Sequence, residues 1–582
     1  MALARAHAIA LVGVQGHPVE IEADIENGMV ALLLVGLPDT ALREARDRIR
    51  SAIINSGESW PSRRITVGLS PASLPKRGSG FDLGIATAIL AASGAVPARR
   101  LRDLVLIGEL GLDGRVRPVP GVLPAAAAAA AGGFGSVVVA RENAAEAALV
   151  PGLTVIAAPT LRALAGWLRG REPARDAAPA GGGPESPGLL AGAARAAEDR
   201  GGGDVVAVID AGAARPALGL PRPASGAAGR PGRAGIPARP GQGAGPGLAG
   251  PACPQASARV PPGGKDLADL VGQPVARRAA EICAAGGHHL MLIGPPGTGK
   301  TMLAERIPAV LPRLGPSEAL EVTAIHSVAG TLPPGCPLVT EPPFCAPHHT
   351  ASRAAIVGGG SGIFRPGAAS LAHHGCLFLD EAPEFARDVL DALRQPLESG
   401  EVVVARAGLT ARFPARFMLI LAANPCPCAS ARTAAAACEC TPLARRRYLA
   451  RLSGPLLDRI DVKVEFLPVR RAELLSDRAF TEASAVVAER VLAARQRAAA
   501  RLAGTPWRLN AQIPGSELRR SFAPPHGALA PLERAMDLGQ ISARGADRVI
   551  RLSWTLADLA GRPRPGSDEV GYALGLWLGM SR

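Results

Sequence analysis

The glycine-rich stretch GPPGTGKT, from Gly294 to Thr301, constrains the fold of this 582-residue chain more than any other feature. It follows the apolar run HHLMLI and precedes MLAERIPAVL, which gives the order strand, glycine loop, helix. Glycines let the backbone wrap around phosphate oxygens while the N–H groups of the loop point inward. The spacing G-x-x-x-x-G-K-T therefore predicts a phosphate-binding loop inside an α/β domain.

Each position of this loop has an expected part in binding a nucleoside triphosphate. Lys300 is expected to reach the β- and γ-phosphates, and the hydroxyl of Thr301 is expected to bind Mg²⁺. The remaining positions complete the expected cradle: Gly294, Pro295, Pro296, Gly297, Thr298 and Gly299. The sequence thus predicts a nucleotide and Mg²⁺ as cofactors.

Two further apolar strands end in polar residues of the kind that completes such a site. The strand Cys376–Leu379 is followed by Asp380, which can hold Mg²⁺, and by Glu381, which can orient and deprotonate water. A solvated acid pair at a strand end is the alternative, and the phosphate loop upstream disfavours it. The strand Phe417–Ala422 leads to Asn424, whose amide can orient water at the γ-phosphate.

The order of these motifs resembles that of the AAA+ ATPases, which implies ATP as the nucleotide. The resemblance places Val271–Gln273 beside the adenine, Arg459 as an arginine finger for a neighbour's ATP, and Arg544 as a second sensor arginine. A lone arginine is more often a surface residue, but the ordered set favours these roles. A finger that acts in trans needs head-to-tail neighbours, so we expect a homo-oligomeric ring, a hexamer by resemblance.

Longer stretches are more specific. APHHTASRAAIVGGGSGIFRPG, LRQPLESGEVVVARA and RYLARLSGPLLDRIDVKVEF together resemble the magnesium-chelatase-like YifB/ComM family. The better-characterised members of that family are hexameric DNA helicases, so the resemblance implies a DNA translocase that drives branch migration in recombination or natural transformation. A protein-remodelling or chelatase-type ATPase and a slow nucleotide-dependent scaffold are the alternatives. A long linker, and Trp554 where arginine is expected, depart from the family pattern.

The first 170 residues are expected to form an α+β domain. PKRGSGFDLGIATAIL and GELGLDGRVRPVPGV resemble the Lon-protease-like domain of the ribosomal-S5 type. That family can carry a Ser–Lys dyad, but its nucleophile position falls at Gly80, with Ser79 one place off, and its lysine position falls at Pro124. Because a serine without an activating base is a poor nucleophile, we expect no protease activity.

The predicted fold class is α/β multidomain, with an N-terminal S5/Lon-like α+β domain (1–170), a flexible linker (171–263), an AAA+ core (264–467) and a helical C-terminal lid (468–582). The linker is rich in glycine, alanine and proline. It cannot bury enough apolar surface to offset its ordering entropy. A short apolar stretch inside it, DVVAVIDAG, has no assigned purpose.

Four of the nine cysteines cluster directly after Asn424 in the pattern Cys-x-Cys, nine residues, Cys-x-Cys. They are Cys426, Cys428, Cys438 and Cys440. Four thiolates suit tetrahedral Zn²⁺, while reduced buried thiols or a redox-labile pair are the alternatives. We expect a closed structural zinc site that holds together a loop lacking a core pattern of its own.

The evidence for DNA is less direct. The net charge of +14 fits a polyanion partner, or merely an arginine-rich composition. GEVVVARAGLTARFPARF predicts a β-hairpin with Arg406 and Arg412 near its tip, which we expect to grip single-stranded or branched DNA inside a ring. A solvated hairpin is the alternative, and residues 358–364 are a second candidate pore loop. Aromatic residues make up 3% of the chain, which favours backbone tracking over base stacking.

Membrane insertion is not expected, because no run of about 18 strongly apolar residues occurs. The N-terminal stretch MALARAHAIALVGVQG is interpreted as a β-strand and not as a signal peptide. An odd number of cysteines, nine, fits a reducing compartment better than a disulfide framework, so we expect a cytoplasmic protein.

Overall fold

The computed structural model describes residues 2–36, 39–74, 76, 78–171, 205–210, 264–333, 336–360, 364–406, 409–428, 440–469 and 481–579. The chain divides into two compact units. The first consists of Met1–Ala10, Gly16–Ala256 and Pro333–Leu338, and the second of Leu11–Gln15, Ser257–Leu332 and Val339–Arg582.

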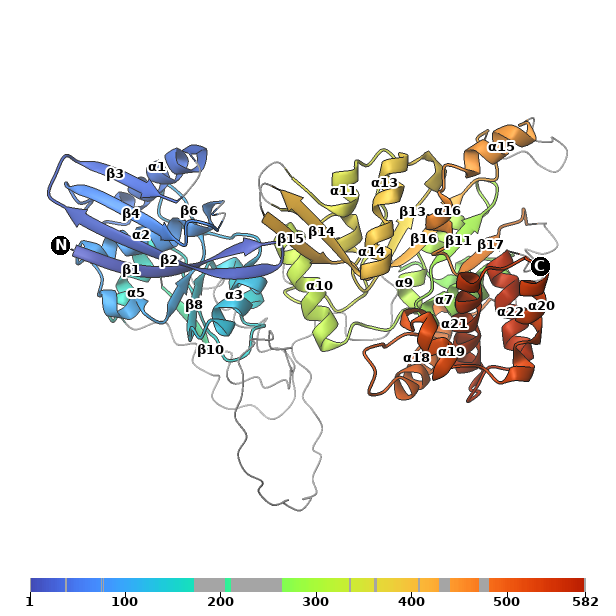
Figure 1. Ribbon diagram of the computed structural model, residues 1–582. Helices are drawn as coiled ribbons and strands as arrows, with labels where there is room; N and C mark the ends of the chain where they lie inside the picture. The colour runs from blue at the N-terminus through green and yellow to red at the C-terminus, as the bar shows by residue number, and fades with distance from the viewer. Residues whose placement is uncertain are drawn as a thin grey trace, which may run out of the picture. The chain divides into compact units, whose positions relative to one another are not determined.

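The first unit is built on an eight-stranded mixed sheet with the order β10-β9-β8-β5-β1-β2-β4-β3 (Figure 1). Its strands are β1 (Ala2–Val12), β2 (Gln15–Glu26), β3 (Ala31–Val35), β4 (Arg64–Ser70), β5 (Leu104–Leu106), β8 (Ser136–Val139), β9 (Thr154–Ala157) and β10 (Ala207–Asp210). Its helices are α1 (Asp39–Asn55), α2 (Asp82–Ala92), α3 (Val122–Ala131), α4 (Ala144–Ala147) and α5 (Leu161–Leu168). Every residue of α2 is buried, which explains why its sequence is apolar apart from Asp82 and Thr87.

A β-hairpin turns at Asp113-Gly114, a residue pair typical of tight turns. It joins β6 (Glu109–Leu110) to β7 (Val116–Arg117), and Gly114 adopts φ 83°, a conformation that glycine tolerates best. The apolar stretch inside the predicted linker also has a structural place. Ala207–Asp210 forms β10, an edge strand that pairs antiparallel with β9, so the expectation of a linker without regular structure is wrong for this segment. Its short apolar run, rich in β-branched residues, is typical of a sheet strand.

The second unit contains a five-stranded sheet with the order β12-β13-β16-β11-β17, and every pairing in it is parallel. The strands are β11 (Leu290–Ile293), β12 (Phe344–Cys345), β13 (Cys376–Leu379), β16 (Met418–Ala423) and β17 (Val462–Glu465). Side chains alternate between two cores: Leu290 and Leu292 pack on one face, and Met291 packs on the other. Burial on both faces explains why these strands are continuous apolar runs in the sequence.

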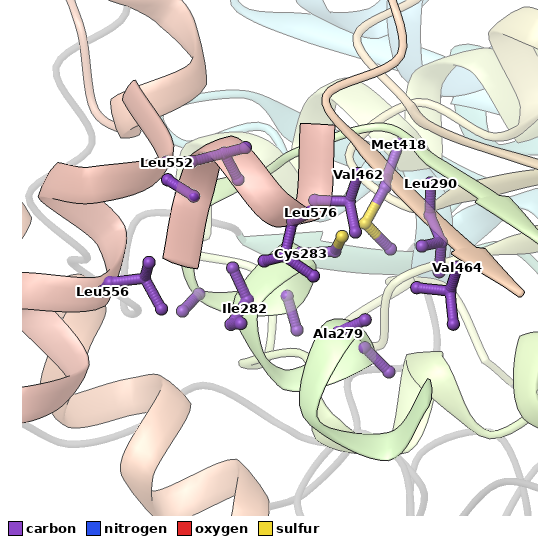
Figure 2. Packing of buried hydrophobic residues seen from close by; sticks show 14 of the residues in the cluster. Ala279, Ile282, Cys283, Leu290, Met418, Val462, Val464, Leu552, Leu556 and Leu576 are labelled. Atoms are coloured by element: carbon purple, nitrogen blue, oxygen red, sulfur yellow. The ribbon is translucent and has the colours of Figure 1, made fainter. Parts of the chain in front are cut away.

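Helices surround this sheet. Those of the core are α7 (Pro274–Gly286), α8 (Lys300–Ala304), α9 (Ile307–Val310), α10 (Pro316–Ala329), α11 (Arg353–Val357), α12 (Ala368–Leu371), α13 (Arg387–Ala392), α14 (Arg394–Ser399), α15 (Pro442–Leu449) and α16 (Gly454–Leu457). Those nearer the C-terminus are α18 (Ser484–Arg501), α19 (Gly515–Arg520), α20 (Ala530–Asp537), α21 (Ala543–Ala560) and α22 (Ser567–Leu578). Figure 2 shows side chains of α7, α21 and α22 packed against β11, β16 and β17.

Trp554, which departs from the family pattern, lies inside this packing. It is 4% exposed, and its ring N–H donates to the carbonyl of Phe522 at 2.8 Å. The guanidinium of Arg501 stacks on the indole, 4.3 Å from the ring centroid. The tryptophan is therefore a core residue of the C-terminal helices and does not change their surface.

The predicted hairpin before the third sheet strand is also present. It consists of β14 (Glu401–Arg406) and β15 (Leu409–Pro414), which pair antiparallel. Arg406 lies opposite Leu409 at the tip, as predicted, but Arg412 lies opposite Val403, away from the tip. The prediction that both arginines lie near the tip is therefore wrong for Arg412, because the register puts three pairs between it and the turn.

Within the described ranges, the structure contains no helix of the length and apolarity that a membrane crossing requires.

Candidate nucleotide and metal sites

The glycine loop connects the end of β11 to the start of α8. Gly297 and Gly299 adopt φ values of 78° and 98°, where residues with a side chain are strained. The amine of Lys300 donates to the carbonyls of Gly294 at 2.6 Å and Pro295 at 2.8 Å, and to Oδ1 of Asn424 at 3.2 Å. Burial lowers the pKa of Lys300, opposed by the charge of Asp380. Lys300 thus contacts both the glycine loop and Asn424, the predicted sensor residue.

Three predicted motifs meet at the carboxyl edge of the parallel sheet. Ile293 pairs with Ala423, and Leu379 pairs with Leu421, so the residues that follow these strands emerge at the same edge. Thr301 Oγ1 donates to Asp380 Oδ2 at 2.7 Å. A hydroxyl and a carboxylate in contact form the hard oxygen pair that suits Mg²⁺. The residues present fit the metal that the sequence predicts.

Glu381 has a neighbour that the sequence analysis missed. Its backbone has φ 49°, in the left-handed region, and its Oε2 lies 3.3 Å from Nδ1 of His349. His349 follows β12, which pairs in parallel with β13, so both residues emerge from the same sheet edge. A histidine this close restrains the orientation of the carboxylate. The sequence feature that could have indicated this neighbour is the pair His348-His349 after an apolar strand.

Asn424 also has a partner from a distant helix. The hydroxyl of Tyr448, on α15, is hydrogen-bonded by the backbone of Asn424, and the ring is 4% exposed. Burial raises the pKa of Tyr448 to about 12, helped by the negative charges of Glu384 and Glu381. The tyrosine therefore stays neutral, and it ties α15 to the segment that bears the predicted sensor.

The predicted adenine-side segment contacts the loop. The amide of Gln273 donates to the carbonyl of Leu467 at 2.8 Å and to that of Thr298 at 3.4 Å. Gln273 is 7% exposed and directly precedes α7. The segment Val271–Gln273 thus lies beside the glycine loop.

The two predicted arginines lie toward the amino edge of the sheet, opposite the edge that carries the glycine loop. Val462 at the start of β17 pairs with Leu290 at the start of β11, so Arg459 precedes the amino edge. The glycine loop leaves the carboxyl edge, one strand length of about 13 Å away at roughly 3.3 Å per residue. The pKa of Arg459 is lowered by burial and by the charges of Arg548, Arg394 and Arg544, which places Arg544 near it. Arg459 pairs with Glu398.

Asp461 anchors this arginine group and was missed by the sequence analysis. It is fully buried, and it accepts from Arg548 at 2.8 Å and from the backbone N–H of His289 at 3.2 Å. Burial alone would raise its pKa, but the charge of Arg548 and a hydrogen bond from His288 hold the pKa well below its usual range. Because Arg548 lies one helical turn after Arg544, this pair fixes α21 against the segment of Arg459.

Three of the four clustered cysteines are described, and their sulfur atoms converge. The sulfurs of Cys426, Cys428 and Cys440 all lie within 4.8 Å of one another, and those of Cys426 and Cys428 are 3.2 Å apart. Zinc–sulfur bonds of about 2.3 Å in a tetrahedron separate the sulfurs by roughly 3.8 Å. The geometry fits such a site. Cys438 lies outside the described residues.

A second group of potential ligands consists of Glu321, His373 and His374. His373 Nδ1 accepts the backbone N–H of Arg416 at 2.9 Å, so in the neutral ring Nε2 carries the proton. Nε2 lies 3.1 Å from Glu321. A metal-bound histidine instead donates a proton from its other nitrogen, so His373 forms a hydrogen-bonded pair with Glu321 and does not suit a metal.

Among the described residues, the family positions Gly80 and Pro124 hold no Ser–Lys dyad. Ser79 donates to Glu109, and Pro124 is buried in α3. Lys76 is 1% exposed, and its amine bonds the carbonyls of Pro71 and Leu74. Burial lowers the pKa of Lys76.

Comparison with known proteins shows the family to which this chain is related. Residues 266–474 match the family described as magnesium chelatase, subunit ChlI; residues 21–143 match subunit ChlI of Mg-chelatase, and residues 481–576 match the C-terminal region of ChlI. An uncharacterized protein of Mycobacterium tuberculosis is 47% identical over 99% of this chain and 98% of its own length. YifB of Salmonella typhimurium is 39% identical over 96% and 94%, and the competence protein ComM of Haemophilus influenzae is 37% identical over 99% and 97%.

The chain belongs to the YifB/ComM family. Its nucleotide module is therefore of the magnesium-chelatase-like AAA+ type, and the protein is an ATPase of that class that uses a nucleotide with Mg²⁺. The YifB/ComM assignment accounts for the parallel sheet and for the apolar strands that lead to the glycine loop and the acid pair.

Proposed function

We propose that this protein is a ring-forming ATPase that translocates on DNA and drives branch migration during recombination or uptake of transforming DNA. The observation that carries the motor part is the division of polar groups between the two edges of one sheet. Lys300, Asp380 and Asn424 gather at the carboxyl edge, while Arg459 lies at the amino edge.

In the hydrolysis site, each side chain has a part that its position supports. Lys300 would bind the β- and γ-phosphates, and Thr301 and Asp380 would hold Mg²⁺ between them. When bound, Mg²⁺ neutralises charge on the phosphate oxygens. Glu381 would take a proton from the attacking water, which Asn424 helps to orient, and His349 would hold Glu381 in place.

Arg459 and Arg544 are proposed to serve the ATP of the adjoining subunit. An arginine one strand length from its own glycine loop is poorly placed to reach its own γ-phosphate. A head-to-tail neighbour would bring its nucleotide to this edge, and repeated contacts of that kind close into a ring. Asp461 would hold the two arginines in register through Arg548.

The DNA part of the proposal rests on the likeness to the competence protein ComM, on the net charge of +14, and on the hairpin β14–β15. Arg406 at the hairpin tip donates to the carbonyl of Gly360, which links the two candidate pore segments. We propose that both segments contact the phosphate backbone of single-stranded or branched DNA.

We also propose a structural Zn²⁺ at Cys426, Cys428, Cys438 and Cys440. The convergence of three described sulfurs supports it. A metal there would join Asn424 on one side of the loop to α15 on the other, and so fix the path from the predicted sensor toward Arg459.

The test of the function is the ATPase rate of the full-length chain with no DNA, with single-stranded DNA and with a branched junction. DNA translocation predicts several-fold stimulation that weakens as salt rises. An ATPase rate that no DNA changes, together with no measurable DNA binding, would favour a protein-remodelling or scaffold role instead.

A further inference from the structure

The helix that follows the cysteine cluster presents arginines that the nucleotide site does not use. α15 has the sequence PLARRRYL, and Arg445, Arg446 and Arg447 are all exposed. Within the described ranges, neither Arg446 nor Arg447 has an ion-pair partner. Cations held this close together repel one another, and a bound anion would relieve that repulsion.

The helix is anchored near its C-terminal end and capped at its N-terminal end. Near the C-terminal end, Tyr448 is buried and its hydroxyl is bonded by the backbone of Asn424. At the N-terminal end, the hydroxyl of Thr441 accepts the backbone N–H of Ala444 at 3.2 Å. Cys440, one of the converging thiols, directly precedes Thr441. An anchored helix loses little conformational entropy when it binds a ligand.

An open pocket of about 570 Å³ adjoins this helix. Arg387, Arg447 and Arg451 line it, and Glu384 is the acid among its lining residues. Glu384 already pairs with Arg451 at 2.8 Å, so the pocket keeps an excess of positive charge. Guanidinium groups bind phosphate through two parallel N–H···O bonds, which makes an arginine-lined pocket suited to phosphates.

The hairpin arginines are more fully engaged with their own chain. Arg412 lies 2.7 Å from Glu401, and Arg406 donates to the carbonyl of Gly360. Binding phosphate there requires these contacts to break or to be shared. Arg446 and Arg447 need give up no such contact, so they offer the less costly site for a polyanion.

We propose that α15 and the adjoining pocket form an arginine surface, made of Arg387, Arg446, Arg447 and Arg451, that binds the phosphate backbone of nucleic acid. This inference rests on the proposed DNA function and deepens it by naming a contact surface outside the hairpin. Binding at this surface is independent of base sequence, because the arginines meet phosphates and few aromatic rings are available for stacking. The arginine surface is also connected to the segment of Asn424, because the backbone of Asn424 is hydrogen-bonded to Tyr448 on the same helix.

The experiment compares the full-length wild type with the double variant Arg446→Glu/Arg447→Glu. Binding to fluorescently labelled duplex and single-stranded DNA of random sequence is measured across a salt series. For duplex DNA, each phosphate contact contributes about 0.9 to the slope of log affinity against log salt, so losing two contacts lowers the slope by about 2. At low salt we expect the affinity to fall at least about tenfold.

The matched control is Arg99→Glu/Arg100→Glu, which makes the same charge change at exposed positions in the first unit. It should keep the wild-type slope and affinity within about twofold. The variant Arg446→Lys/Arg447→Lys keeps the charge and should keep most of the slope. An unchanged melting temperature separates lost binding from lost folding, and Arg446→Gln/Arg447→Gln replaces the double variant if that one does not fold.

The outcomes separate the two proposals. If the wild type binds DNA and the double variant binds it equally well, the arginine surface is wrong while the DNA function stands. If the wild type binds no DNA, the proposed function fails first, and this inference falls with it. Binding to polyglutamate is measured in the same way, as a probe for an acidic protein. If the double variant loses binding to polyglutamate but not to DNA, the surface serves an acidic protein, which overturns the inference.

Discussion

At the scale of single residues, the contact of Thr301 with Asp380 at 2.7 Å marks where Mg²⁺ would bind, and Glu381 lies beside it. Glu381 is nearly half-exposed and is restrained by His349. A carboxylate that must accept a proton from water benefits from a fixed orientation and from access to solvent. In the proposed function, hydrolysis would therefore depend on the charge of Glu381 more than on its volume.

Replacing Glu381 with glutamine should leave ATP binding intact and slow hydrolysis by roughly 100-fold to 10,000-fold, the range for removal of a general base. Lys300→Ala should instead weaken nucleotide binding itself. Both effects are measured by ATPase rate and by titration with a fluorescent ATP analogue. Asp388→Asn, at an exposed acid on α13, is the control. Near-normal turnover in Glu381→Gln would show that another group activates the water.

The residues of this site could be predicted from sequence where each follows its own apolar strand. Lys300, Asp380 and Asn424 are of this kind, because parallel strands carry their following residues to one edge. The contacts of His349 and Tyr448 could not be predicted from the sequence. They reach the site through loops and a helix whose paths depend on tertiary packing, which a local pattern does not encode.

His373 offers a test of the buried polar contacts. Burial lowers its pKa to about 4, and its Nδ1 accepts a backbone N–H, so protonation would set two donors against each other. The unfolded chain binds a proton near pH 6.5, so the stability from this group is present above that pH and is lost toward pH 4. The stability difference between wild type and His373→Ala should shrink by roughly 2 kcal/mol from pH 7.5 to pH 5.

Urea unfolding at the two pH values measures this difference. His526→Ala, a change at an exposed position in the short helical turn 526–528, is the control and should give no comparable change. A stability difference that stays constant between pH 7.5 and pH 5 would mean that His373 is not held neutral by its surroundings.

At the scale of secondary-structure elements, the strands and the hairpin follow from alternation and apolar runs, and their bounds agree closely with the sequence pattern. The register of β14 with β15 could not be read from that pattern, which is why Arg412 lies farther from the tip than expected. The edge strand β10 lies in a stretch dominated by glycine, alanine and proline. Its pairing depends on the exposed edge of β9, which the local sequence does not reveal.

The loop between β16 and α15 should depend on metal. Purified protein should contain about one zinc per chain by elemental analysis, following the four-ligand count. Cys440→Ser should lose the metal, lower the melting temperature and impair ring assembly. The control is Cys345→Ser on β12, where burial raises the thiol pKa to about 11 and disfavours the thiolate that zinc requires. A metal-free protein with full activity would leave the cysteine cluster without this role.

At the scale of the whole molecule, the sheet separates the group proposed to hydrolyse ATP from the arginines proposed to stabilise charge. The order of motifs along the sequence predicted each group. The separation itself became visible only from the parallel pairing of β11 with β17, which puts Arg459 and the glycine loop at opposite edges. In the proposed function, this separation is the reason that a subunit would need its neighbour, and hydrolysis would be a property of the assembled ring.

Mixing two inactive proteins tests this claim most directly. Arg459→Ala subunits keep Glu381, and Glu381→Gln subunits keep Arg459, so some interfaces in a mixed ring hold both groups intact. Random mixing at equal amounts leaves about a quarter of the interfaces intact. We predict that the mixture regains ATPase activity well above that of either protein alone, and that Arg544→Ala behaves in the same way. No gain in activity, although labelled subunits are shown to exchange, would contradict action between subunits.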